Sequence, residues 1–128
     1  MGRTVCEAVS ADPDLVFCAA VDPSAVGEQI AGVTVADHLH AFADSECDVV
    51  VDFTIADVAR DALPWLAMHG IHAVVGTTGF SDADVQLFES AFAAADGPNC
   101  VIAPNFAISA VLMMRFAAMA APFFDTAE

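Results

Sequence analysis

Residues 98–109 read Pro-Asn-Cys-Val-Ile-Ala-Pro-Asn-Phe-Ala-Ile-Ser and join a short apolar run to a long apolar helix pattern. The run Cys100–Ala103 is broken by Pro104, and Asn105 precedes the helical stretch. This pattern predicts a strand whose carboxyl end leads directly into a helix. In open parallel α/β sheets, ligands bind at the edge formed by such strand ends. We therefore expect part of a binding site in this stretch.

Two earlier stretches, Val49–Thr54 and Val74–Phe80, have the same design of an apolar run followed by polar or glycine residues. The valines at 49–51 are typical of a strand in a parallel sheet that is covered on both faces. Three strand ends of this kind in one chain predict a single ligand crevice.

The rest of the chain alternates helical and strand patterns. We expect helices at 1–10, 37–43, 54–69, 81–96 and 105–121, and strands at 15–21, 33–35, 49–51, 71–75 and 100–103. No apolar strand precedes the first helix. The order predicts an α/β fold, a doubly wound parallel sheet of Rossmann type (three-layer α/β/α) that lacks its first strand. We expect one partial dinucleotide-binding domain over residues 1–124.

Three features refine the helices. Thr54 and Asp57 have capping-box spacing, and so do Ser81 and Asp84. Pro64 lies inside the predicted helix 54–69 and should kink it or split it in two.

Composition and charge exclude several classes of partner. The chain has 128 residues, 18 of them acidic and 3 basic, for a net charge of -15. So much negative charge repels phosphate backbones and anionic membranes, so we expect neither nucleic acid nor membrane as partner. The first ten residues show no secretory signal, and we expect a cytoplasmic protein.

The cysteines and the longest apolar run support the same location. No Cys-x-x-Cys spacing is present, and we expect buried, reduced thiols at Cys6, Cys18, Cys47 and Cys100. The apolar run 106–124 contains Arg115 and Pro122, which a membrane-spanning helix tolerates badly. We interpret this run as a buried helix, partly uncovered if a neighbouring domain is absent.

Asp22 is a candidate for binding a cofactor. It closes the strand predicted at 15–21, where a dinucleotide-binding fold places an acid for the adenosine ribose hydroxyls. An ordinary turn acid before Pro23 is the alternative. A carboxylate with no arginine beside it would also repel a 2′-phosphate, which favours NADH over NADPH.

The remaining candidates lie at the other strand ends. Asp52-Phe53-Thr54 offers an aromatic face, with helix capping by Thr54 as the alternative. Gly76-Thr77-Thr78-Gly79-Phe80 combines glycines that allow close approach of a ligand with hydroxyl donors, with an ordinary turn as the alternative. Asn105 either donates to a ligand or caps the last helix.

No metal or catalytic set is predicted. The spacings of His38, His40, His69 and His72 do not match a metal site on one helix face, so we interpret them as structural or solvated. No Ser-His-Asp or Cys-His arrangement is indicated either.

Three motifs together resemble the 4-hydroxy-tetrahydrodipicolinate reductase (dihydrodipicolinate reductase) family of bacterial lysine and diaminopimelate biosynthesis. They are Val-Val-Val-Asp-Phe-Thr, Gly-Ile-His-Ala-Val-Val-Gly-Thr-Thr-Gly-Phe and Ile-Ala-Pro-Asn-Phe-Ala-Ile-Ser-Ala-Val-Leu-Met. The resemblance covers essentially the whole chain, as the family's N-terminal cofactor-binding domain. It implies an NAD(P)H-dependent oxidoreductase that reduces a cyclic imine dicarboxylate, 4-hydroxy-tetrahydrodipicolinate, to tetrahydrodipicolinate, and that works as a homo-oligomer, a tetramer.

The resemblance also implies a set of cofactor-binding residues. Asp22 falls at the ribose-binding acid, and Met1-Gly2-Arg3 looks like the tail of the family's glycine-rich phosphate loop, with Gly2 as its last glycine. The nicotinamide side would be formed by Phe53, Gly76, Thr77, Thr78, Ala103, Pro104, Asn105 and Phe106.

Departures from the family pattern limit what the chain is expected to do. The start of the phosphate loop and the family's His-His-x-x-Lys catalytic motif have no match here, so no catalytic residue is carried over. Residues 125–128 would begin the crossover to a substrate and oligomerisation domain that is absent. We therefore expect a fragment truncated at both ends, inactive alone and weak in NADH binding.

Two other functions stay open. One is a non-catalytic nucleotide-binding or redox-sensing module. The other is a different NAD(P)-dependent reductase of the aspartate pathway, such as a homoserine dehydrogenase-like protein.

Overall fold

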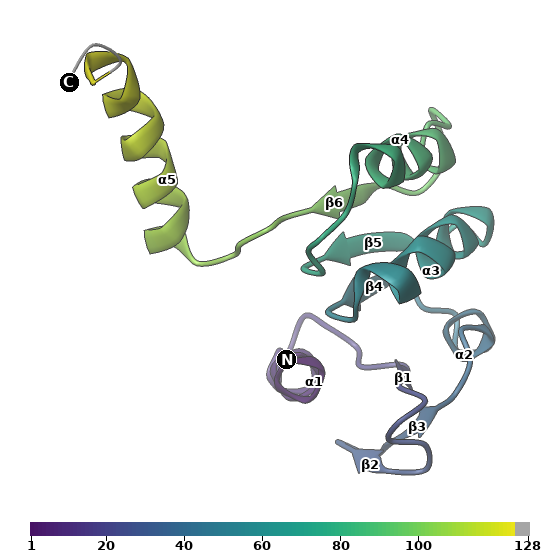
Figure 1. Cartoon of the computed structure of the whole chain (residues 1–128). Coiled ribbons are helices and arrows are strands. Elements are labelled where there is room, and N and C mark those ends of the chain that lie inside the picture. Colours follow the sequence, from purple (N-terminus) through teal and green to yellow (C-terminus); the bar gives the residue numbers. More distant parts are fainter. Residues whose placement is uncertain (125–128) are drawn as a thin grey trace.

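A computed structural model of the chain describes residues 1–124, in which helices and short strands alternate (Figure 1). The elements in order are α1 (Gly2–Ala11), β1 (Ala20–Val21), β2 (Gln29–Ile30), β3 (Val33–Ala36), α2 (His40–Asp44), β4 (Val49–Asp52), α3 (Ala56–Met68), β5 (His72–Val75), α4 (Asp82–Ala91), β6 (Cys100–Ile102), α5 (Ile108–Ala120) and a 3-10 helix, η1 (Ala121–Phe123). The predicted crossover residues 125–128 lie outside the described part.

Strands β4, β5 and β6 form a parallel sheet in that order. The register places Val51 beside Val74 and Val74 beside Val101. Alternate side chains therefore face opposite sides, and Val50, Ala73 and Val75 are buried on one of them. The predicted parallel α/β fold is confirmed.

Helices α3 and α4 cover one face of this sheet and complete the core (Figure 1). Its largest fully buried side chains are Phe88, Leu63, Leu66 and Val75. The opposite face is much less covered, since Val49 is 49 % and Val101 56 % exposed. The expectation that the valine strand is buried on both faces is therefore wrong. Side chains of α1 and of β4 line a small hollow.

The remaining strands form a second sheet in the order β1-β3-β2. Strand β3 is parallel to β1 and antiparallel to β2, a pairing that we did not expect. The strand predicted at 15–21 is reduced to Ala20–Val21. Among the described residues, no backbone ladder joins β1 of this sheet to β4 of the main sheet. In a doubly wound fold, the first strand of the domain lies at this position, between the two halves of the sheet.

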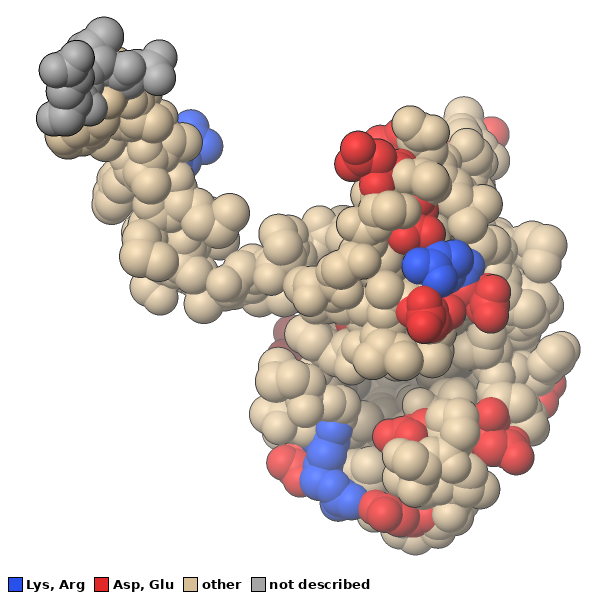
Figure 2. All heavy atoms as spheres, viewed as in Figure 1, with Lys and Arg blue, Asp and Glu red and all other residues tan. Residues whose placement is uncertain are grey.

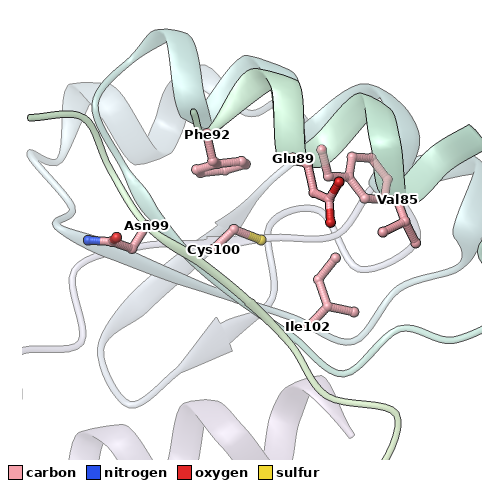
Figure 3. A pocket seen from close by; sticks show the side chains of 7 residues that line it. Val85, Glu89, Phe92, Asn99, Cys100 and Ile102 are labelled. Carbon is pink, nitrogen blue, oxygen red and sulfur yellow. The ribbon is translucent and has the colours of Figure 1, made fainter. Parts of the chain in front are cut away.

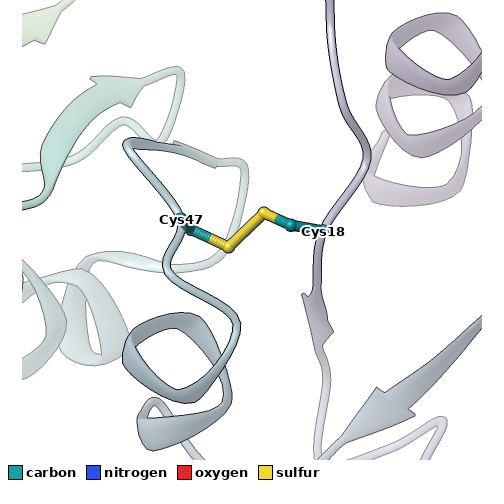
Figure 4. The surroundings of a disulfide bond; sticks show 2 residues. All are labelled: Cys18 and Cys47. Carbon is teal, nitrogen blue, oxygen red and sulfur yellow. A yellow bond between two sulfur atoms is a disulfide. The ribbon is translucent and has the colours of Figure 1, made fainter.

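A disulfide between Cys18 and Cys47 crosses this break (Figure 4). The two residues lie just before β1 and β4, and their Cα atoms are 6.2 Å apart. The expectation of reduced thiols is thus wrong for this pair, because the starts of two strands distant in sequence meet in space. Cys6 and Cys100 are free, and burial is the main cause that raises the pKa of both thiols.

The helix boundaries correct three expectations. Helix α3 runs through Pro64 as one helix, so the predicted split is wrong. Thr54 does not cap it, because its hydroxyl donates to Asp52 and the helix begins after Ile55. Helix α4 has the predicted capping box, in which the Ser81 hydroxyl accepts from the Asp84 amide, but it ends at Ala91 rather than near residue 96.

Helix α5 begins at Ile108, three residues later than predicted, and stands away from the rest of the molecule (Figure 1). It has no buried residue, so the expectation of a buried helix is wrong. Its large apolar side chains are exposed, among them Met113 (68 % exposed) and Phe116 (63 % exposed). None of the described helices is both long and apolar enough to cross a bilayer.

The charges are distributed unevenly over the surface. In the part of the molecule outside α5, the basic side chains lie next to acidic ones. The basic side chain on α5 has no acidic side chain beside it in this view (Figure 2). Arg60 bonds Asp57 and Asp84, and Arg3 bonds Glu28. Arg115 is the single charged residue of α5.

Candidate active site: the carboxyl edge of the main sheet

The three strand ends singled out in the sequence meet at one edge of the main sheet. Two backbone hydrogen bonds continue the ladder beyond the strands, from the Gly76 amide to the Asp52 carbonyl (2.8 Å) and from the Ala103 amide to the Val75 carbonyl (2.9 Å). The residues that follow β4, β5 and β6 are therefore neighbours. The three strand ends therefore come together as predicted, whereas the ligand crevice predicted between them stays a prediction.

Two aromatic residues from different strand ends face each other at this edge. The ring centroids of Phe53 and Phe106 are 5.9 Å apart, with the rings tilted. Phe53 also lies against Gly76, where a Cβ atom would overlap the Phe53 ring. Phe106 remains 50 % exposed. The arrangement gives an apolar surface, partly open to solvent, that suits one face of a planar ring.

Hydrogen bonds to Asp52 join the loop after β4 to the loop after β5. One oxygen of Asp52, Oδ1, accepts hydrogen bonds from the Thr77 hydroxyl (2.6 Å) and from the amide and hydroxyl of Thr54 (both 2.9 Å). Asp52 and Thr77 are buried, whereas Thr78 is exposed. The two threonines of the loop therefore face different surroundings.

Asn105 stabilises the turn that leads into α5. Its side-chain oxygen accepts a hydrogen bond from the Ala107 amide at 2.8 Å. Because α5 begins after Ala107, Asn105 is not the residue that caps the helix. Pro104 lies beside it, between the strand and this turn. This contact uses the side-chain oxygen of Asn105, so the side-chain NH2 group remains available as a hydrogen-bond donor.

Asp22 lies in the other sheet, at the end of β1. Its Oδ1 accepts hydrogen bonds from the Ser24 hydroxyl (2.6 Å) and the Ser24 amide (2.8 Å). The bond from the Ser24 hydroxyl, and after it the bond from the Ser24 amide, lower the pKa of the exposed Asp22 carboxyl. The contacts fit the turn-acid reading, and the negative charge at a strand end fits the ribose reading as well.

Met1 and Gly2 lie at the start of α1, where the Met1 carbonyl accepts from the Val5 amide at 3.1 Å. The structure brings neither into contact with the Phe53–Phe106 pair. Their predicted role toward cofactor phosphates stays a prediction.

Known proteins resemble this chain over its whole length. The sequence profile of the family described as "Dihydrodipicolinate reductase, N-terminus" matches residues 1–106. The chain belongs to this family.

Relatives and a solved structure show the extent of the match. The 4-hydroxy-tetrahydrodipicolinate reductase of Nocardia farcinica is 44 % identical over 128 residues, which are 100 % of this chain and 47 % of that protein. The one of Thermobifida fusca is 60 % identical over 81 residues, 63 % of this chain and 33 % of that protein. A structure described as dipicolinate-bound dihydrodipicolinate reductase from Paenisporosarcina sp. TG-14 aligns with a TM-score of 0.74 at 27 % identity, over 94 % of this chain and 50 % of that one. The chain thus spans about half the length of relatives that it matches in full.

Membership of the dihydrodipicolinate reductase family indicates which kind of ligand suits the carboxyl edge. The N-terminal domain of this family binds a nicotinamide cofactor. The apolar surface of Phe53 and Phe106, with the Phe53 ring packed directly on Gly76, fits a flat ring of nicotinamide type.

Two hollows lie elsewhere on this reductase-family chain. One, of about 410 Å³, opens between α4 and β6 (Figure 3). The other, of about 100 Å³, lies between α1 and β4 and is lined by Cys6, Cys18 and Cys47. Neither contains a predicted site residue, and neither lies at the carboxyl edge.

The histidines serve local contacts. His69 stacks on Trp65 with ring centroids 3.7 Å apart, and His40 lies edge-on to the same Trp65 at 5.3 Å. His72 accepts a hydrogen bond from the Asn99 amide at 2.8 Å. Among residues 1–124, no group of His, Cys, Asp or Glu is arranged to hold a metal ion.

One residue of this edge, Asp52, was not assigned from the sequence. In the structure Val50 and Asp52 share the buried side of β4, but the run of three valines before Asp52 has no alternation that would indicate this side from the sequence. A carboxylate at a core position requires hydrogen-bond partners.

Proposed function

We propose that this chain is the cofactor-binding half of a 4-hydroxy-tetrahydrodipicolinate reductase. In the whole protein, hydride from NADH or NADPH and one proton would convert the cyclic imine dicarboxylate 4-hydroxy-tetrahydrodipicolinate to tetrahydrodipicolinate, with the hydroxyl group leaving as water, in lysine and diaminopimelate biosynthesis. The observation that carries this proposal is the meeting of Phe53, Phe106 and Gly76 at the carboxyl edge of the parallel sheet. Family membership supports it independently.

In this proposal the chain's own residues bind and orient the nicotinamide side of the cofactor. Phe53 and Phe106 offer the apolar surface for the ring. Gly76, Thr77, Thr78, Ala103, Pro104 and Asn105 supply backbone groups and side-chain donors around it. When bound, the cofactor supplies the hydride. The proton and the dicarboxylate contacts belong to the part of the enzyme that this chain does not match.

Asp22 would select between the two cofactors. The Asp22 carboxylate carries a negative charge at the end of β1, where it would repel the 2′-phosphate of NADPH and accept hydrogen bonds from the ribose hydroxyls of NADH. Met1 and Gly2 would hold part of the diphosphate at the start of α1. We therefore propose NADH as the preferred cofactor.

The domain, the location and the assembly follow as proposals. Residues 1–124 form the partial dinucleotide-binding domain, and the whole enzyme is a cytoplasmic homotetramer that takes a small dicarboxylate.

Titration of the purified chain with NADH, followed by NMR of the backbone amides, tests the proposal. We expect weak binding that shifts the amides of Gly76–Thr78 and Ala103–Phe106. With 4-hydroxy-tetrahydrodipicolinate present, NADH absorbance at 340 nm should stay constant. The absence of shifts at both loops would contradict a cofactor role for this edge, and steady NADH oxidation would contradict the view that the proton-donating part lies elsewhere.

A comparison of NADH with NADPH tests the role of Asp22. We expect NADPH to bind several-fold more weakly, and Asp22→Asn to narrow this difference because the repulsion is removed. Equal affinities of the parent chain for both cofactors would contradict the proposed preference.

A further inference from the structure

The carboxylate of Asp52 is the polar centre of an otherwise apolar part of the core. Asp52 is 6 % exposed and Thr77 is 4 % exposed. Asp52 pairs with Val75 in the sheet, and Val50 shares its buried side of β4. An ionised carboxylate in such a place is costly unless donors surround it. Here the donors come from two separate loops.

The hydrogen bonds join the loop after β4 to the loop after β5. Thr54 supplies its amide and its hydroxyl from the first loop, and Thr77 supplies its hydroxyl from the second, 25 residues later. All reach the same oxygen, Oδ1. The backbone bond from the Gly76 amide to the Asp52 carbonyl lies beside them. Asp52 thus holds both partners of the Phe53–Gly76 contact, because Phe53 follows it in the chain and Gly76 donates a hydrogen bond to it.

This arrangement divides the roles of the two neighbouring threonines. The Thr77 hydroxyl is directed into the protein and is already donated to Asp52 at 2.6 Å. Thr78 is exposed, whereas Thr77 is buried.

We propose that Asp52 is a positioning residue for the cofactor site, and that it acts through the Thr77 hydroxyl. It fixes the Gly76–Gly79 loop relative to Phe53, and it leaves Thr78 as the threonine whose side chain meets the nicotinamide side of the cofactor. This inference rests on the proposed function, because it specifies how the same edge is held ready for its ligand. A loop held in its binding conformation before the ligand arrives loses less conformational freedom on binding.

Variants of Thr77 and Thr78 form a matched pair for the test. Thr77→Val keeps the shape of the side chain and removes the donor, whereas Thr77→Ser keeps the hydroxyl. Thr78→Val makes the same change on the exposed neighbour. Asp52→Asn keeps an acceptor oxygen but removes the charge, so it is milder than removal of the side chain.

Hydrogen exchange in the absence of ligand reports the positioning directly. The amides of Thr54 and Gly76 both bond to Asp52, whereas the Ala73 amide bonds to the Asn99 carbonyl in the middle of the sheet and reports global folding. We expect Thr77→Val to speed exchange at Thr54 and Gly76 by about tenfold, the effect of one lost hydrogen bond to a charged group. Exchange at Ala73 should not change, and Thr77→Ser and Thr78→Val should behave like the parent chain.

NADH titration supplies the second readout. A loop that occupies its binding conformation for a smaller fraction of the time binds more weakly in proportion. We expect Thr77→Val to raise the NADH dissociation constant by up to about tenfold and Thr77→Ser to restore it. Thr78→Val should weaken binding without faster exchange. Combined with Asp52→Asn, Thr77→Val should cost less than the sum of the two single changes.

The two proposals fail in different ways. If Thr77→Val leaves exchange at Thr54 and Gly76 unchanged, Asp52 does not position the loop, whether or not NADH binds. If the parent chain shows the expected exchange pattern but no NADH binding, the positioning stands as a property of the loop and the cofactor role of this edge is overturned.

Discussion

Gly76 shows how one residue can determine the shape of the candidate site. It has no side chain, and the space that a Cβ would occupy is taken by the Phe53 ring. Phe53 in turn faces Phe106 across the edge of the sheet. A change at this single position therefore affects an aromatic pair that comes from two other strand ends.

We expect Gly76→Ala to destabilise the chain by about 1–3 kcal/mol, the usual cost of overpacking a well-packed position. Urea unfolding of the parent chain and the variant measures this difference. In a Phe53→Ala background the same Gly76→Ala change should cost little, because the obstructing ring is gone. Equal costs in both backgrounds would show that Phe53 is not the obstacle.

The sequence allowed part of this site to be predicted at the residue scale. Phe53, Gly76 and Phe106 follow strand runs, and the ends of parallel strands share an edge, so their proximity follows from the pattern. The partner of the Thr77 hydroxyl does not follow in this way. We expected it to be a free donor, but it is bonded to Asp52, a contact between loops far apart in sequence that depends on the exact register of β4 and β5.

At the scale of single elements, an ion pair joins the start of α4 to α3. Arg60 of α3 donates from Nε to Asp84 at 2.6 Å, and Asp84 also accepts from the Ser81 amide and hydroxyl. Arg60 is the main cause that holds the pKa of the Asp84 carboxyl well below its usual range, with the Ser81 bonds next. Asp57 bonds the same arginine but is 83 % exposed.

We expect the stability of the chain to fall as the pH drops below about 4, the ordinary pKa of an aspartate in an unfolded chain. A carboxyl whose folded pKa is lowered stabilises the fold above that value, and the contribution is lost as the pH falls toward the folded pKa. Asp84→Asn should therefore lower the urea midpoint at pH 7 and flatten its dependence on pH between about 5 and 2. Asp57→Asn is the control, with a much smaller effect because the acid is exposed. Identical acid slopes for the parent chain and Asp84→Asn would contradict this assignment.

The hairpin of β2 and β3 is a second element with a testable weakness. Ile30 pairs with Val33, and the two residues between them, Ala31 and Gly32, both have positive φ angles of 47° and 87°. Such a turn favours asparagine before the glycine, whereas an alanine in this conformation is strained.

We expect Ala31→Asn to stabilise the chain by about 0.5–1 kcal/mol, as relief of that strain suggests. Thermal melting of the two proteins at matched concentration measures the change. Gly32→Ala should have the opposite sign, because it places a Cβ at a positive φ angle. A lower melting temperature for Ala31→Asn would contradict the turn type.

Helices could be predicted because their pattern lies within a short stretch of sequence. Strands were predicted less well, because a strand forms only where another strand pairs with it. The Ser81–Asp84 capping box and the helices α1 and α4 follow from residues close in sequence. The apolar stretch at 15–21 has a strand pattern, but only Ala20–Val21 finds a neighbour to pair with. Strand β2 was missed because Ala31-Gly32 lacks the asparagine that usually marks such a turn.

The whole molecule consists of an acidic body and an apolar helix that extends from it (Figures 1 and 2). Large exposed apolar patches are uncommon on monomeric proteins and usually mark a contact with another surface. Helix α5 carries such side chains around much of its circumference and only one charge, so we expect it to drive self-association of the isolated chain.

Sedimentation velocity over a range of protein concentrations tests this expectation. The parent chain should shift to larger species as the concentration rises, and the double change Met113→Glu and Phe116→Glu should keep it monomeric. Ser109→Glu adds a negative charge to the same helix without removing an apolar side chain, so it should associate like the parent chain. A parent chain that is monomeric throughout would show that α5 does not drive association.

The Cys18–Cys47 bond also changes the covalent topology of the molecule. It closes the backbone between these residues into a ring that contains β1, β2, β3 and α2. A protease that cuts once within this ring, for example near Gly27 in the turn before β2, releases no fragment. The nicked chain would migrate as one piece on a denaturing gel without reductant and as two pieces once a thiol is added, so the proteolytic history of a sample is hidden until the bond is opened.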